Sequence, residues 1–307
     1  MKILGKQCKR FGLSVFLSNF FISLLLMGCV AQDNFGFTQQ GMLLAQQTPE
    51  QHSEQEEMLL RLNQILLIAP LNTEERADLH FERGVIYDSL GLWKLASYDF
   101  ALSLRLQPGM APAYNYLGLY FLLQQDYDEA LEAFNAVLTL QPNYEYAYLN
   151  RGLHFYYTER YHLAQQDFER FYQYDPSDPY RALWLYFNEV KLDPRQAIVN
   201  LGERANSLSP DYWGTQIVDY FVGKISLNQL LQKIAEIDQQ SVSYAEVLTE
   251  TYFYLAKQQL NTNHIDEAMR LFKLAVANQV YNFVEYRFAL FELSQWRDND
   301  KQGAVAQ

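Results

Sequence analysis

The sequence predicts an all-α protein, a solenoid of stacked antiparallel helix pairs with an extra helix at its start and a capping helix at its end. Three observations predict this fold class. Leu, Ala, Glu and Gln are common, whereas 307 residues include 14 Gly and 9 Pro, a composition that favours helices. Apolar residues recur at helical spacing along much of the chain. Pro108, Pro142, Pro176 and Pro210 follow one another at a constant spacing of 34 residues.

A fixed spacing of 34 residues indicates stacked repeats, and it is the length of a tetratricopeptide repeat. Within residues 71–296 the expected units are 77–110, 111–144 and 145–178, a degenerate unit at 179–212, and a further unit at 249–282. Small residues let the two helices of a unit approach closely, aromatic residues fill the space between units, and proline ends the second helix. These positions are Gly84, Tyr87, Ala96, Phe100 and Pro108; Tyr114, Leu117, Gly118, Phe121, Ala130, Phe134 and Pro142; and Tyr148, Gly152, Phe155, Ala164, Phe168 and Pro176.

The pattern weakens after residue 178. Residues 179–212 keep Pro210, but Asp193-Pro194 interrupts their helix pair, so this unit is either a degenerate repeat or an irregular helical pair. The unit at 249–282 has Tyr252, Leu255, Ala256, Ala268 and Phe272 in register. Residues 283–296 are expected to form the capping helix that a terminal repeat needs, and residues 297–307 a polar, frayed tail.

The first residues have the composition of a secretory signal. Three lysines and one arginine within the first ten residues precede an apolar stretch, 11–27, that is too short and too interrupted to predict a membrane span. The stretch ends in Leu26-Met27-Gly28-Cys29, which resembles a bacterial lipobox, where the chain is cut before a cysteine that then carries lipid. We expect a signal peptide at 1–28, lipidation at Cys29 and a flexible, Gln-rich tether at 29–53. An ordinary signal peptide cut nearby is the alternative.

A single amphipathic helix is expected between the tether and the repeats. In residues 54–70, apolar side chains recur at helical spacing and Pro70 ends the run. The apolar positions are Met58, Leu59, Leu62, Ile65 and Leu66.

Charge and motifs exclude several function classes. The formal net charge is −12, which argues against a nucleic-acid-binding protein. The five histidines show no metal-ligand spacing, and no His-Glu-x-x-His, Gly-x-Ser-x-Gly or P-loop pattern is present. Cleavage would leave Cys29 as the one cysteine, so no intramolecular disulfide is expected. We therefore expect no enzyme activity, no metal site and no cofactor.

Stacked helix pairs have a concave side that is lined by the first helix of each pair. Asn there can hydrogen-bond the main chain of an extended peptide, and Tyr can cover its side chains. The residues expected to line this protein-binding groove are Asn115, Tyr116, Leu119, Tyr146, Asn150, Arg151 and Tyr157. For each tyrosine, packing against neighbours or the terminal helix is the alternative. Arg151, and Arg83 at the equivalent place, could bind an acidic partner or pair with acids of the solenoid itself.

Several stretches resemble the NlpI lipoprotein family of Gram-negative bacteria. They are YDSLGL at 87–92, NYLGLY at 115–120, LNRG at 149–152, YDPSDP at 174–179, and LFKLAVAN with NFVEYRFALFELS within 271–294. The resemblance runs from the lipobox through the capping helix. Its C-terminal block is the most specific part, because the generic repeat pattern does not require it.

This resemblance implies an outer-membrane lipoprotein that faces the periplasm, and Val30 after the lipobox agrees with that membrane. Family members act as homodimeric adaptors that bind peptidoglycan endopeptidases and a tail-specific protease, and so control cell-wall degradation during growth and division. Their dimer contact involves N-terminal helices, which here implies Leu59, Leu62 and Ile65. A non-catalytic, lipid-anchored adaptor is therefore the expected function. The alternatives are an assembly factor for outer-membrane proteins or pili, and a cell-wall enzyme.

Overall fold

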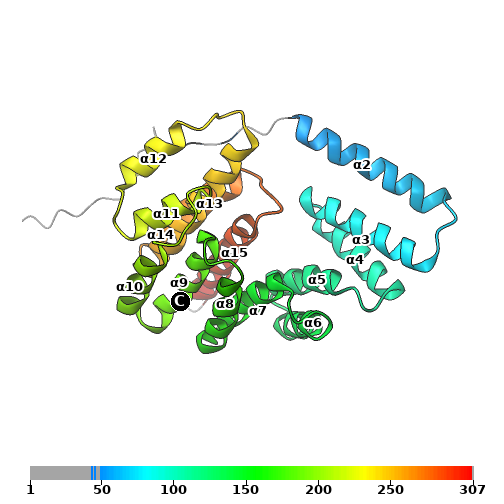
Figure 1. Ribbon diagram of the computed structural model, residues 1–307, viewed down its shortest axis with the longest axis horizontal. Coiled ribbons are helices and arrows are strands. Elements are labelled where there is room, and N and C mark those ends of the chain that lie inside the picture. Colours follow the sequence, from blue (N-terminus) through cyan, green and yellow to red (C-terminus); the bar gives the residue numbers. More distant parts are fainter. Residues whose placement is uncertain (1–42, 44, 46–48, 306–307) are drawn as a thin grey trace, which may run out of the picture. The chain divides into compact units, whose positions relative to one another are not determined.

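The structure is a computed structural model that describes residues 43, 45 and 49–305. Within these residues every regular element is a helix (Figure 1), which confirms the all-α class. The described residues belong to one unit, Leu43–Gln307. The predicted signal peptide, Cys29 and the tether up to residue 42 lie outside the described residues.

The helices pack in consecutive pairs, as the repeat spacing predicts. The pairs are α3 (Thr73–Ser89) with α4 (Trp93–Leu106), α5 (Ala111–Gln124) with α6 (Tyr127–Leu140), α7 (Glu145–Tyr157) with α8 (Tyr161–Tyr174), α9 (Pro179–Leu192) with α10 (Pro194–Arg204), and α13 (Val242–Asn261) with α14 (Ile265–Ala277). Helix α2 (Pro49–Ile68) precedes them, and the short α11 (Gly214–Phe221) and α12 (Leu227–Ala235) connect the last two pairs. Helix α15 (Val284–Val305) ends the chain and packs against α13, α14 and α5.

A glycine in the first helix of each of the first three pairs lies against a phenylalanine in the second. A Cβ atom added to the glycine would stand 2.7–2.8 Å from the ring, closer than packed atoms approach. The three contacts are Gly84 with Phe100, Gly118 with Phe134, and Gly152 with Phe168. All three rings are fully buried. The 34-residue period therefore fixes how closely the two helices of each repeat approach.

The Asp193-Pro194 step separates two helices instead of breaking a repeat. Helix α9 ends at Leu192, and the Asp193 carboxylate accepts hydrogen bonds from the backbone N–H groups of Arg195 and Gln196 at 3.0 and 3.1 Å. Pro194 is the first residue of α10, where its missing N–H is not needed. Residues 179–204 therefore form an irregular helix pair with a one-residue connection.

Two expected boundaries are wrong. Helix α2 begins at Pro49 and not at residue 54, and α15 continues to Val305, so most of the predicted tail at 297–307 is helical. Both extensions are polar and carry no apolar periodicity, which is why the pattern missed them. Residues 297–302 nevertheless contain no Gly or Pro to stop the helix.

Helix α2 occupies the place that the second helix of a preceding repeat would take. The Arg83 guanidinium donates a hydrogen bond to Asn63 of α2 at 2.7 Å, just as Arg151 donates to Asn135 of α6 at 2.9 Å. Leu62 is only 4% exposed. The expectation that Leu62 forms a dimer contact is therefore corrected, because this side chain is used within the protomer.

We expect Gly152→Ala to lower the free energy of unfolding by about 2 kcal/mol, because its Cβ would overlap the Phe168 ring in a closely packed core. Gly202→Ala in α10 is the matched control. An added Cβ there meets no atom within 4 Å, and the higher helix propensity of Ala should raise stability by about 0.5–1 kcal/mol. Urea unfolding followed by circular dichroism measures both variants. Equal free energies for the two would contradict the close packing at Gly152.

Candidate functional site

A hollow of about 420 Å³ lies between the first helices of the first three pairs and the beginning of α15. Below, this space is called the hollow. Its walls come from α3, α5, α7 and the residues around the start of α15. The lining residues are Val85, Asp88, Ser89, Asn115, Tyr116, Leu119, Tyr144, Tyr146, Leu149, Asn150, Asn282, Val284 and Arg287. Five of the seven predicted groove residues are among them.

Two asparagines from adjacent repeats lie side by side in the wall of the hollow. The Asn150 side-chain N–H₂ group donates to the side-chain oxygen of Asn115 at 3.0 Å. The two residues are only 4% and 7% exposed, and what is exposed faces the hollow. Each amide carries more donor and acceptor capacity than this one bond uses. The pair therefore offers hydrogen bonds to a main chain that enters the hollow.

Aromatic and apolar side chains complete the lining around these amides. Tyr116 stacks on Phe100 with 4.5 Å between ring centroids, and Leu119 is almost fully buried. Tyr146 is 51% exposed at the rim, with its ring 6.1 Å from that of Phe171. Burial, assisted by the nearby Asp88, raises the pKa of Tyr116 to about 12. The Tyr116 hydroxyl therefore stays protonated at neutral pH.

A buried ion pair joins α15 to the first repeat and forms part of the wall. The Arg287 guanidinium lies 2.5 Å from the Asp88 carboxylate, and both side chains are nearly inaccessible. The Tyr120 hydroxyl donates to Asp88 at 2.5 Å, and Arg287 Nε donates to the Tyr281 carbonyl at 3.0 Å. The two charges offset each other, so this part of the wall presents no net charge to the hollow.

A second hollow, of about 520 Å³, also has Arg287 in its wall. It lies between α4, α5 and α15, with Trp93, Leu123 and Phe291 among its lining residues. The Arg287–Asp88 pair therefore stands between two spaces. Sequence reasoning missed Arg287 as a lining residue. The available signal was a cation inside the mainly apolar stretch 283–291, where a buried charge needs a partner.

Tyr157 does not line the hollow, and its assignment to the groove is corrected. Its ring stacks on Phe288 of α15 at 5.1 Å, and its hydroxyl donates to Glu292 at 2.9 Å. Lys257 of α13 reaches the same carboxylate at 2.6 Å and is 3% exposed. Tyr157 therefore packs against the terminal helix, which was the alternative for each tyrosine.

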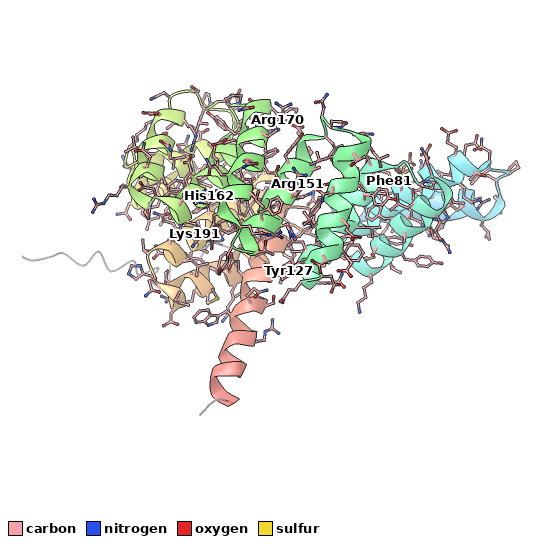
Figure 2. The ribbon with its side chains drawn as sticks, turned by 90° about the horizontal axis from the view of Figure 1, so that it is seen from below. Phe81, Tyr127, Arg151, His162, Arg170 and Lys191 are labelled. Atoms are coloured by element: carbon pink, nitrogen blue, oxygen red, sulfur yellow. The ribbon has the colours of Figure 1, made fainter. Side chains whose placement is uncertain are left out.

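Arg151 also lies outside the hollow (Figure 2). Its Nε and Nη2 atoms each donate to the Asp167 carboxylate of α8 at 2.8 Å. Arg83 binds Asp99 of α4 in the same bidentate way. Both arginines therefore pair with acids of the solenoid itself, and the assignment of Arg151 to the groove is corrected. The reason is helical geometry, since Arg151 follows Asn150 by one residue and points about 100° away around α7.

The second repeat shows that this ion pair is optional. One period of 34 residues before Arg151 and Asp167 stand Leu117 and Ala133. Ala133 is 7% exposed, so an apolar pair fills the same seam between the two helices. The same fold therefore accepts either a buried ion pair or two apolar side chains at this place.

We expect Arg151→Leu alone to lower the free energy of unfolding by about 3 kcal/mol, because it leaves the buried Asp167 carboxylate without its cation. The double variant Arg151→Leu with Asp167→Ala copies the second repeat and should recover most of that loss. Urea unfolding of both variants measures the difference. A double variant no more stable than the single one would show that the two repeats do not pack equivalently.

Other classes of site are absent from the part of the chain that the structure describes. Among residues 43, 45 and 49–305, no three or more His, Cys, Asp or Glu side chains are grouped to hold a metal ion. No helix within the same residues combines the length and apolar character needed to cross a membrane.

Comparison with known folds and families returns repeat proteins. A profile of the tetratricopeptide repeat matches residues 111–144, which comprise α5 and α6. Among solved structures, a tetratricopeptide repeat protein from Parabacteroides merdae is similar with 16% identity and a TM-score of 0.49, covering 80% of this chain and 93% of that one. YrrB, described as a tetratricopeptide-repeat protein with an unusual peptide-binding site, is similar with 13% identity and a TM-score of 0.39, covering 66% and 86%.

A much closer relative is a lipoprotein NlpI homolog from Haemophilus influenzae. The two sequences are 61% identical over 280 residues, which cover 91% of this chain and 89% of the relative. Such identity over nearly the whole length includes the C-terminal block that the repeat pattern does not require. The chain therefore belongs to the NlpI lipoprotein family.

Proposed function

We propose that this protein is a non-catalytic adaptor, anchored to the outer membrane by lipid on Cys29 and facing the periplasm. It binds peptidoglycan endopeptidases and a tail-specific protease and thereby regulates cell-wall degradation during growth and division. Family membership and the lipobox support the anchor, and the tetratricopeptide repeats support the binding of proteins.

The observation that carries the proposal is the amide pair in the wall of the hollow. Asn115 and Asn150 come from adjacent repeats, and their unused donors and acceptors border an accessible space. An extended peptide has one N–H and one C=O group per residue, which match the two functions of an amide side chain. The partner is therefore held mainly by its main chain.

The electrostatics of the hollow favour an uncharged stretch of the partner. Arg287 is paired with Asp88, and Arg83 and Arg151 are paired outside the hollow with Asp99 and Asp167. No cation of these three is left to bind an acidic peptide. Tyr146 at the rim offers an exposed aromatic surface for an apolar side chain of the partner.

We expect Asn150→Ala to reduce capture of endopeptidase and protease from periplasmic extract by about tenfold, because hydrogen bonds to the partner's main chain are lost. Asn135→Ala is the matched control, since Asn135 is an exposed asparagine outside the hollow that bonds Arg151. Pull-down with the soluble body, quantified by mass spectrometry, measures both variants.

Each outcome of that pull-down is decisive. Equal capture by the two variants would place partner binding outside the hollow. A wild-type body that returns no cell-wall hydrolase and no protease would overturn the proposed function. Recovery of outer-membrane or pilus assembly components in their place would favour the assembly-factor alternative.

We also propose that a second copy of the chain covers the outer face of α2. Leu60 and Leu67 are 71% and 83% exposed, and they lie two helical turns apart on the face opposite the buried Leu62. Ile65, 40% exposed, flanks this face, and Leu59 is half-buried. Such an apolar surface on one helix is typical of an interface between subunits.

For this dimer, Leu60→Asp with Leu67→Asp should yield a folded monomer, because two charges would enter the apolar contact. Leu62→Asp should instead lower the thermal stability of the protomer, since this side chain is 4% exposed. Light scattering measures the mass, and circular dichroism measures the melting temperature. An unchanged dimer in the double variant would exclude the outer face of α2 as the contact.

A further inference from the structure

A short segment ahead of α2 is hydrogen-bonded to the last helix pair. Leu43 contacts Tyr252 of α13, and Ala45 contacts Asn278 at the end of α14. The partners are separated by 209 and 233 residues along the chain. Nothing in the repeat pattern requires this association, because the segment precedes the first repeat.

The contacts involve only main-chain atoms of the segment. The Tyr252 hydroxyl accepts from the Leu43 N–H at 3.2 Å and donates to the Leu43 carbonyl at 2.8 Å. The Asn278 side-chain oxygen accepts from the Ala45 N–H at 3.2 Å. Its side-chain nitrogen donates to the Leu274 carbonyl at 3.1 Å, which fixes the orientation of the amide.

Residues i and i+2 of an extended chain present their main-chain groups on the same side, as along the edge of a β-strand. Tyr252 and Asn278 therefore bind the segment as a neighbouring strand would bind an edge. Both side chains are 1% exposed. Burial raises the pKa of Tyr252 to about 12, so its hydroxyl remains a hydrogen-bond donor at neutral pH. Without the segment these polar groups would lose hydrogen-bond partners at a buried position.

We propose that α13 and α14 carry a docking site for extended main chain, built on Tyr252 and Asn278, and that the chain's own Leu43–Ala45 segment fills it. If Cys29 carries lipid, as the proposed function states, the membrane tie then reaches the protein body at α13 and α14. Residues 30–42 would remain between the lipid and the docked segment, and thirteen residues span at most about 45 Å. The docking itself does not depend on the lipid.

Two single substitutions test the docking in the full-length lipoprotein in detergent. Tyr252→Phe removes both hydrogen bonds to Leu43 and keeps the ring, and Ala45→Pro removes the Ala45 N–H without changing α13 or α14. Thermolysin cuts before leucine, and cleavage at Leu43 and Leu44 requires the segment to leave its site. Each lost hydrogen bond should speed cleavage about fivefold.

Tyr186→Phe and Ala31→Pro are the matched controls. Tyr186 donates its hydroxyl to Gln258 of α13 and does not touch the segment, and Ala31 lies outside it. Cleavage of both controls should equal that of the wild type. Equal rates for the controls and the two test variants would overturn the proposal.

Dilution identifies the chain that supplies the segment. An unchanged wild-type cleavage rate over a wide range of protein concentration supports docking within one chain. A rate that rises on dilution would mean that a second copy supplies the segment, and would overturn the proposal as stated. Capture of periplasmic partners by Ala45→Pro should equal that of the wild type, so a failed docking test and a failed adaptor proposal remain distinguishable.

Discussion

Two buried ion pairs hold α15 in place, and the hollow depends on them. Arg287 is joined to Asp88 of α3, and Glu292 is joined to Lys257 of α13. A charge buried in a protein is tolerated when it is paired and hydrogen-bonded, and it is strongly destabilising when its partner is lost. Helix α15 therefore has one position in which all four charges are satisfied, and that position sets one wall of the hollow.

The pairing also determines what kind of partner the hollow can select. Arginines near the repeats would suit an acidic ligand if they were free, but Arg83, Arg151 and Arg287 are each bound to an aspartate of the same chain. Selection then rests on main-chain hydrogen bonding and shape instead of long-range attraction. An interface of that kind gains little from electrostatic steering, so its binding should depend weakly on salt.

Much of the fold could be predicted from the sequence because a repeat encodes its contacts locally. The contact of Gly152 with Phe168 lies within one period, and so does the register that puts Asn115 and Asn150 in adjacent repeats. The position of α15 could not be predicted, since Arg287 and Asp88 are 199 residues apart and belong to no common period. The apolar stripe of α2 was ambiguous for another reason. Periodicity shows that Leu62 lies on an apolar face, but it does not show whether that face meets the same chain or a second copy.

The hollow and the Tyr252–Asn278 site use the same chemistry on different helix pairs. Both offer polar side chains to an extended main chain, one from α5 and α7 and the other from α13 and the end of α14. Because the lining side chains are separate, a partner in the hollow and the docked segment need not compete for the same groups. Helix α15 contacts both regions, since it packs against α13 and α14 while Val284 and Arg287 line the hollow. Its buried ion pairs oppose any displacement, so attachment to the membrane and binding of a partner should act independently unless α15 itself moves.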